Sequence, residues 1–401
     1  MIFEHCRYFW SSEGDRPPLR FPLSLLQVCR KWRDITTAAP TLWTDIVILA
    51  SEENNNLDLN AARLFMERSK SCPLSLTWDN PHRNQDPVIH DILSPASYRL
   101  KNLTIEARFR IPDSLLITLE AMQFPTLEYF SFTEWCRSRG PPLPLPSVAA
   151  VNLYAPRLHR CVSLNSVVPT GTLSSLARLE IVIFRHDRPF DPAAFFDLLR
   201  NTAQNLKRLR LEGLKLPLRG YSLNAPNVRL QALEDLTLQF ASEFLLFISA
   251  PNLHTLRLCD DSVHSIPSSE GFRAPKLTHL HFSDLLLLDL ETNVDLPWQF
   301  RELETVVFFE CHSTDSSFFR HASSTRNGVP AFPSLSSITL TDPEAFGSVK
   351  SMVEGQKAAN PGTTTLKKLH LLDWDWTISL DDREWMSTQG IGFSAAPLET
   401  P

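Results

Sequence analysis

The feature that most limits how this chain can fold is a short apolar pattern that returns eleven times. The pattern is Leu-x-x-Leu-x-Leu, with Ile, Val or Phe at some of the leucine positions, and copies begin about 20 to 32 residues apart. The copies begin at Leu100, Leu127, Val148, Leu176, Leu206, Leu233, Leu253, Leu277, Leu303, Leu335 and Leu366. Because apolar and variable residues alternate at the end of each copy, each predicts a short strand with one inward face. One such strand cannot bury that face alone, whereas stacked copies form a continuous core.

This spacing is typical of leucine-rich repeats, whose strands pair in parallel along one side of a curved solenoid. The Asn or Cys that usually follows three positions after the last leucine occurs only once, as Cys311. The segments between the strands are therefore left open as helices, 3₁₀ turns or loops. Thirty prolines against twelve glycines agree with many short, punctuated elements. We expect an irregular solenoid with a parallel strand face.

The variable residues between the leucines are expected on the open, concave side of these strands. In the later copies they include a set of basic residues and histidines that we take as candidates for binding a target. The candidates are Arg208, Arg210, Arg257, His279, His281, Lys368 and His370. Arginine matches carboxylate and phosphate geometry, so this face could hold an acidic or phosphorylated segment. The alternative is a solvated face with internal ion pairs, for example Arg210 with Asp235.

A second feature is an amphipathic segment near the N-terminus. Its apolar residues recur every three to four positions, which predicts one helix from about Pro22 to Ala39, ended by Pro40. These apolar residues are Leu25, Val28, Cys29, Trp32 and Ile35, and Leu42 and Trp43 follow as a bulky apolar plug. A helix this short must dock on another part of the chain or on a partner.

The same residues resemble the second half of an F-box motif, through Val28-Cys-Arg-x-Trp-Arg-Asp-Ile35 and the following Leu42-Trp43. Ile2-Phe-Glu-His-Cys6 resembles the end of the first F-box helix. Glu67-Arg-Ser-Lys-Ser-Cys-Pro-Leu-Ser-Leu76 resembles a segment that follows the F-box in the large fungal F-box-like families. The resemblance covers roughly the first eighty residues, and the repeats resemble the leucine-rich tails of those proteins.

The resemblance implies a substrate-recruiting subunit of an SCF-type (Skp1–cullin–F-box) ubiquitin ligase. Its N-terminal module would bind a Skp1-like adaptor and through it a cullin, and its repeats would bind an unknown protein target. The implied adaptor contacts are Phe3, Leu25, Val28, Cys29, Trp32, Ile35 and Trp43, although each could instead pack within the module. The usual Leu-Pro-x-Glu opening is absent before Met1, so either the gene model is incomplete or the adaptor surface is impaired. The alternative function is a stand-alone leucine-rich-repeat scaffold without a ligase link.

The expected fold class is an α+β or α/β repeat in four parts. These are an incomplete F-box-like helical module over 1–48, a connecting helix and strand over 49–99, the solenoid over 100–385 and a flexible tail over 386–401. Within the connecting part we expect a helix at 60–70 and a strand at 74–78. Trp374 and Trp376 are expected to cover the open end of the solenoid.

Several other functions find no support in the sequence. A net charge of −6 argues against a general nucleic-acid binder, and no apolar run approaches the roughly 18 residues of a membrane span. Seven scattered cysteines, without a signal-peptide core, indicate reduced thiols and a cytoplasmic or nuclear protein. No phosphate-binding glycine loop or nucleophile elbow is present, so we expect no enzyme. We also expect no cofactor and no metal, since His279 and His281 have no evident third ligand.

Overall fold

The computed structural model describes most of the chain, with gaps at several loops and at both ends. The described residues are 21–49, 55–79, 86–107, 113–134, 149–165, 167–183, 192–214, 228–259, 272–283, 300–311, 318–319, 322–323, 325–326, 329–342, 345–359, 365–372 and 378–395. Phe3, Trp374 and Trp376 lie outside these residues. Contacts divide the chain into two compact units, Met1–Asn201 and Thr202–Pro401, which are described in turn.

The first unit opens with two helices where the sequence predicted one. They are α2 (Phe21–Val28) and α3 (Arg30–Ala38), followed by the 3₁₀ helix η1 (Pro40–Trp43). The prediction of a single helix over 22–39 is wrong because Cys29 is fully extended, with φ −160° and ψ 172°. An extended residue restarts the helical period, so the apolar positions before and after Cys29 do not form one stripe.

Trp43 anchors this helical segment to the rest of the first unit. Its indole ring is 1% exposed and meets the edge of Phe65 on the next helix at a centroid distance of 5.1 Å. The indole Nε1–H donates a hydrogen bond of 2.9 Å to the carbonyl oxygen of Thr36. A buried aromatic ring with its polar atom satisfied is a stable anchor.

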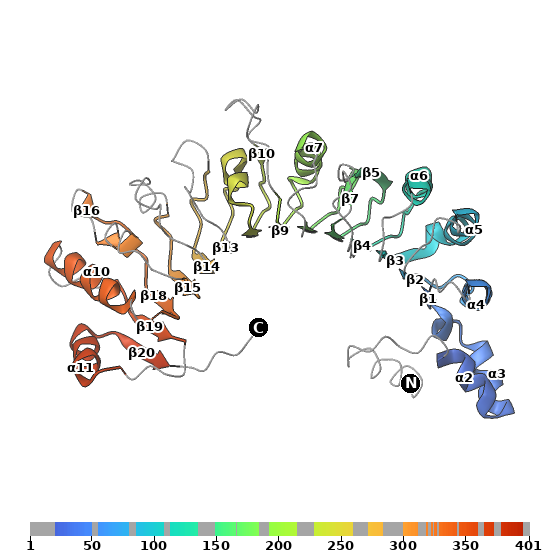
Figure 1. The fold of residues 1–401 in the computed structure, drawn as a ribbon, viewed down its shortest axis with the longest axis horizontal. Helices are drawn as coiled ribbons and strands as arrows, with labels where there is room; N and C mark the ends of the chain where they lie inside the picture. The colour runs from blue at the N-terminus through green and yellow to red at the C-terminus, as the bar shows by residue number, and fades with distance from the viewer. Residues whose placement is uncertain are drawn as a thin grey trace, which may run out of the picture. The chain divides into compact units, whose positions relative to one another are not determined.

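The first unit contains a ladder of six parallel strands, in the order β1-β2-β3-β4-β6-β8. The strands are β1 (Asp45–Leu49), β2 (Leu74–Asp79), β3 (Leu100–Ala107), β4 (Tyr129–Glu134), β6 (Arg160–Leu164) and β8 (Arg178–Val182). The segments between them form helices α4 (Asn55–Arg68), α5 (Asp86–Ala96), η3 (Ser97–Arg99), α6 (Asp113–Ala121) and, after β8, α7 (Pro192–Thr202). Figure 1 shows α4, α5 and α6 together on one side of these strands.

The ladder begins earlier than the sequence predicted. The helix and strand expected at 60–70 and 74–78 are α4 and β2, and both are present. Strands β1 and β2 precede the boundary expected between 99 and 100, yet they belong to the same ladder, because β1 pairs with β2 and β2 pairs with β3. These two strands alternate buried and half-buried residues as the later strands do, so they extend the same core.

One predicted repeat strand lies outside the ladder. The copy at Val148 forms β5 (Ala149–Tyr154), which pairs with β7 (Val167–Thr172) in a separate two-stranded sheet. Its place in the ladder is taken by β6, where the core positions are Cys161 and Ser163. These small residues stand in register with Phe130 and Phe132 of β4, whose large rings compensate for the missing leucines.

The second unit contains eight parallel strands, in the order β9-β11-β13-β14-β15-β18-β19-β20. They are β9 (Arg208–Glu212), β11 (Asp235–Gln239), β13 (Thr255–Cys259), β14 (His279–Ser283), β15 (Thr305–Phe309), β18 (Ser337–Leu340), β19 (Lys368–Leu371) and β20 (Gly392–Ala395). Between them lie η4 (Ser242–Phe247), α10 (Ala345–Ala359), α11 (Leu380–Gln389) and two small strand pairs, β10 (Val228–Arg229) with β12 (Ile248–Ser249) and β16 (Thr325–Arg326) with β17 (Val329–Pro330). The spacers left open by the sequence are thus of several kinds.

The expected flexible tail over 386–401 is wrong for its described part. Helix α11 is capped at its start by the Ser379 hydroxyl, which accepts a hydrogen bond from the Asp382 amide. It ends at Gly390, whose φ of 69° suits a glycine cap. Strand β20 then pairs in parallel with β19, and Met386 and Ile391 nearby in the chain are buried.

The inward residues of the second unit form continuous columns. Successive strands bring Leu236, Leu256, Leu280 and Val306 into register, and each is at most 1% exposed. Such columns are the expected consequence of stacking strands that each have one apolar face.

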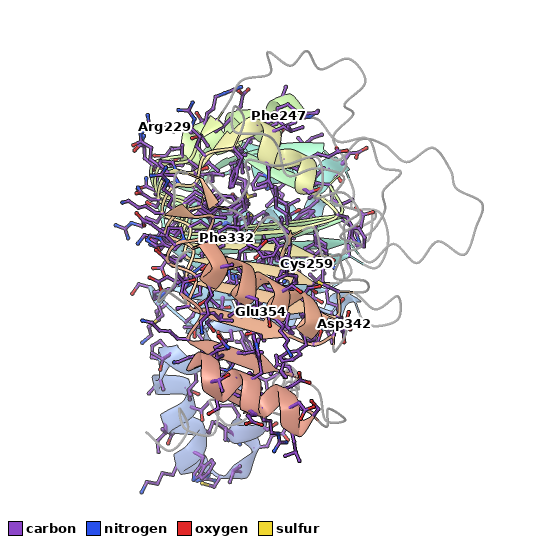
Figure 2. All side chains as sticks on the ribbon, turned by 90° about the vertical axis from the view of Figure 1, so that its left-hand side faces the viewer. Arg229, Phe247, Cys259, Phe332, Asp342 and Glu354 are labelled. Carbon is purple, nitrogen blue, oxygen red and sulfur yellow. The ribbon has the colours of Figure 1, made fainter. Side chains whose placement is uncertain are left out.

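The core of this unit contains an aromatic cluster that includes inward residues of β14 and β15. Phe308 on β15 stacks on Phe282 of β14 at 5.4 Å and contacts Phe318 at 5.2 Å. Phe318 in turn stacks on Phe332 at 5.4 Å. Phe332, labelled in Figure 2, is fully buried, whereas Glu354 on α10 lies at the surface.

Candidate functional site

The structure brings the predicted basic residues into two rows on the open face of the second unit. The row at the start of the strands is Arg208, Asp235, Thr255, His279, Thr305, Ser337 and Lys368, each in register with the next. The second row is Arg210, Thr237, Arg257, His281, Val307, Thr339 and His370. All seven candidates therefore share one face as expected, while their role in binding a target remains a prediction.

Two of the arginines in the second row are paired within the protein. The Arg257 Nη1 atom lies 2.7 Å from Asp235 Oδ1, and the Arg210 Nη2 atom lies 3.0 Å from Glu212 Oε2. The expected pair of Arg210 with Asp235 is wrong, because Asp235 pairs instead with Arg257 on β13, its other neighbouring strand. The alternative of internal ion pairing thus holds for these two arginines, although with different partners.

The other two basic candidates stand apart from these pairs. Among the described residues, no carboxylate lies within ion-pair distance of Arg208 or Lys368, and both residues are exposed. They begin β9 and β19, so five strands of the ladder separate them. Two cations this far apart do not form one compact anion site.

His281 is a half-buried ionisable group of the open face. Burial, together with the positive charge of Arg257, lowers its pKa, so the ring is neutral near pH 7. Its ring meets Phe309 edge-to-face at 6.4 Å, and its Nε2 atom is buried without a hydrogen-bond partner among the described residues. A neutral, partly covered imidazole contributes packing here, not positive charge.

The remaining histidines of the face are engaged in local hydrogen bonds. The Nδ1 atom of His279 lies 2.8 Å from the Thr278 hydroxyl, and that of His370 lies 2.5 Å from the Ser394 hydroxyl. Within the part of the chain that the structure describes, no cluster of three or more His, Cys, Asp or Glu side chains could hold a metal ion.

The candidate adaptor contacts fall into a buried and an exposed set. Leu25 and Trp43 are buried and Trp32 is half-buried, whereas Val28, Cys29 and Ile35 are exposed. Val28 is 59% exposed and Ile35 41%, values that are high for residues of this type. The buried set stabilises the module, and the exposed set is available to a partner.

Sequence reasoning missed a second polar row, at the N-terminal ends of the strands of the first unit, which we call the edge of that unit. Tyr129, Arg160 and Arg178 begin β4, β6 and β8 and stand side by side in the ladder. A degenerate repeat, Leu158-x-x-Cys161-x-Ser163, was the available signal for β6. Two of its three core residues are not leucine, so the leucine pattern does not include it.

Buried Cys161 on the same strand has no catalytic character. Burial raises the pKa of its thiol far above the usual range, so the thiol stays protonated. A protonated thiol is a poor nucleophile and a poor metal ligand. Cys161 therefore contributes to the packing of the core.

Together, these features define an α/β protein whose parallel ladder strands bury one face and present a polar one. No protein-family model and no curated protein matches the chain. Among the described residues, every helix is too short or too polar to cross a lipid bilayer.

Proposed function

We propose that this protein is a substrate-recruiting F-box-like subunit of an SCF-type ubiquitin ligase, with a leucine-rich-repeat ladder that binds the target. The observation that carries the proposal is the exposure of Val28, Cys29 and Ile35 on a helical segment that Trp43 anchors to helix α4 of the first unit. The motif resemblance assigns this segment to the contact with a Skp1-like adaptor and, through it, a cullin.

The chemistry of the exposed set suits an adaptor contact. Apolar side chains in the centre of a protein interface are covered on binding, and their removal from water drives association. Burying Val28 or Ile35 fully would each contribute on the order of 1 kcal/mol, given about 25 cal/mol per Å² of apolar area. Trp43 holds the segment in place, so little ordering cost is added on binding.

The ladder supplies the second surface that recruitment requires. Its strands are stacked in register over a closed apolar core, which makes the open face a rigid platform. A subunit with one surface for the adaptor and one for the target raises the effective concentration of the target near the ubiquitin-carrying enzyme. The covalent chemistry would belong to the partners.

The proposal is tested by co-purification with Skp1. The full chain is compared with a version extended by an F-box opening of the Leu-Pro-x-Glu type and with the variants Val28→Asp and Ile35→Asp. Each substitution is expected to lower Skp1 capture at least about tenfold, because an unpaired carboxylate in an apolar interface costs more than about 1.4 kcal/mol.

Ile117→Asp is the matched control. Ile117 lies on α6 of the same unit and is 65% exposed, so its substitution introduces the same charge away from the proposed contact. Capture is expected to be unchanged, with the same circular dichroism spectrum for all three variants. If neither the chain nor its extended version retains Skp1, the ligase function is rejected and the stand-alone scaffold remains.

A further inference from the structure

Two arginines stand side by side at one edge of the first unit. Arg160 and Arg178 are the first residues of β6 and β8 and are Cα partners in the parallel ladder. Neighbouring strands lie about 4.8 Å apart, so both guanidinium groups can reach one small group above the sheet. Tyr129 holds the corresponding position on β4 and is the partner of Arg160 on its other side.

The charge at this edge is incompletely balanced. Arg178 has one carboxylate, Glu180, at 3.8 Å, which is close to the limit of an ion pair. Arg160 lies over the Tyr129 ring at 5.5 Å. Glu128, which directly precedes Tyr129, is paired with Lys101 at 3.2 Å. Like charges directly opposite each other on paired strands are destabilising, so an anion above the pair would relieve the repulsion.

The backbone fixes the positions of both arginines. The Arg160 amide donates to the Glu128 carbonyl at 3.1 Å, and the Arg178 amide donates to the His159 carbonyl at 2.9 Å. The residues that follow the two arginines, Cys161 and Leu179, are fully buried, which sets the register. The pair is therefore held by the scaffold before any ligand arrives.

The second unit differs in this respect. There Arg210 and Arg257 each have a carboxylate within 3.0 Å, and a threonine stands between them in the row. An acidic ligand would have to displace an existing ion pair at those positions. At the edge of the first unit, Arg160 can receive the ligand while keeping its contact with Tyr129.

We propose that Arg160 and Arg178, beside Tyr129, form an anion-binding subsite for an acidic extended segment of a protein. Two planar guanidinium groups offer parallel N–H donors that match a carboxylate or a phosphoryl group. The stack on Tyr129 orients one of the two forks. The identity of the bound protein as the recruited target rests on the function proposed above, whereas the subsite itself does not.

The subsite is tested by fluorescence anisotropy with the purified full chain. The probes are three fluorescein-labelled degenerate heptapeptide libraries whose central residue is phosphoserine, glutamate or serine. The phosphoserine or the glutamate library is expected to bind more tightly than the serine library. Tighter binding of phosphoserine identifies a phosphoryl source, and equal binding of the two identifies a carboxylate.

Substitutions locate the binding. Arg160→Gln and Arg178→Gln are each expected to weaken binding about tenfold or more, because hydrogen bonds to charged groups contribute about 1.5–3 kcal/mol. Arg160→Lys keeps the charge but loses the fork, so an intermediate loss is expected. The matched control, Arg257→Gln on the ion-paired arginine of the second unit, is expected to leave binding unchanged.

Three results would overturn the subsite. They are equal binding of all three libraries, equal losses in Arg160→Gln and Arg257→Gln, and tighter binding of a polyuridine RNA than of any peptide. Skp1 capture is measured on the same protein samples. Capture without peptide binding rejects the subsite alone, and peptide binding without capture rejects the ligase function alone.

Discussion

Replacing Phe308 with alanine tests how the second unit is held together. The Phe308 ring is 1% exposed and lies 5.2 to 5.4 Å from the rings of Phe282, Phe318 and Phe319. A buried phenylalanine covers about 150 Å² or more of apolar area, which corresponds to about 4 kcal/mol at 25 cal/mol per Å². Since alanine retains the Cβ atom and leaves a cavity, the expected loss is about 3–5 kcal/mol.

The adjacent residue supplies the control. Val307 stands next to Phe308 on β15 but belongs to the open face, where it is half-buried. Val307→Ala removes two methyl groups that are partly in water already, so the expected loss is about 1 kcal/mol or less.

The assay is hydrogen exchange followed by mass spectrometry on peptides that span β14, β15 and β18. It reports the free energy of local opening in this part of the ladder directly. Phe308→Ala should raise the exchange rate of these peptides far more than Val307→Ala. If the two substitutions have equal effects, the assignment of inner and outer faces fails, because a shift of one residue exchanges the two faces.

Two further predictions concern local conformation and pH. Gly171 has a φ of +98°, and an added Cβ atom would overlap the Asn152 side chain, so Gly171→Ala should destabilise by more than about 1 kcal/mol. Gly347→Ala, at an open position in a helix, should instead stabilise by about 0.5–1 kcal/mol, and thermal shifts of the same sign in both variants would contradict the reasoning. Burial and then Arg257 lower the pKa of His281 below its unfolded value, so its contribution to stability is complete above about pH 6.5 and is lost as the pH falls through the folded pKa. Between about pH 7.5 and about pH 5.5, the urea midpoint of His281→Gln should therefore fall less than that of the natural chain, and an equal fall would refute this role.

Much of the second unit could be predicted from the sequence because the signal there is local. In a strand, neighbouring side chains point to opposite faces, so Leu256 and Leu258 predict the inward side and Arg257 the open side. The structure confirms both placements, and it places His281 beside Arg257 in the row. The same argument could not predict that Asp235 would pair with Arg257, since its two neighbouring strands carry Arg208, Arg210 and Arg257 and side-chain rotamers decide between them.

Where the local signal is weak, the prediction failed. Strand β6 carries Cys161 and Ser163 in the core, where the large rings of the phenylalanines on the strand beside it fill the space that leucines would occupy. The extended backbone at Cys29 divides a helix that the apolar spacing alone had joined. Strand β20 has few apolar residues and is placed by its pairing with β19.

The sequence by itself determined that the chain builds a repeated parallel ladder, and which residues of each clear repeat face inward. It did so because side-chain alternation depends on only a few consecutive residues. Tertiary structure alone decided which strands became neighbours, and therefore that Arg160 and Arg178 meet beside Tyr129. Strand pairing joins residues distant in the sequence, so the packing of the core determines which strands pair. That pairing in turn determines which charged residues of the open face become neighbours.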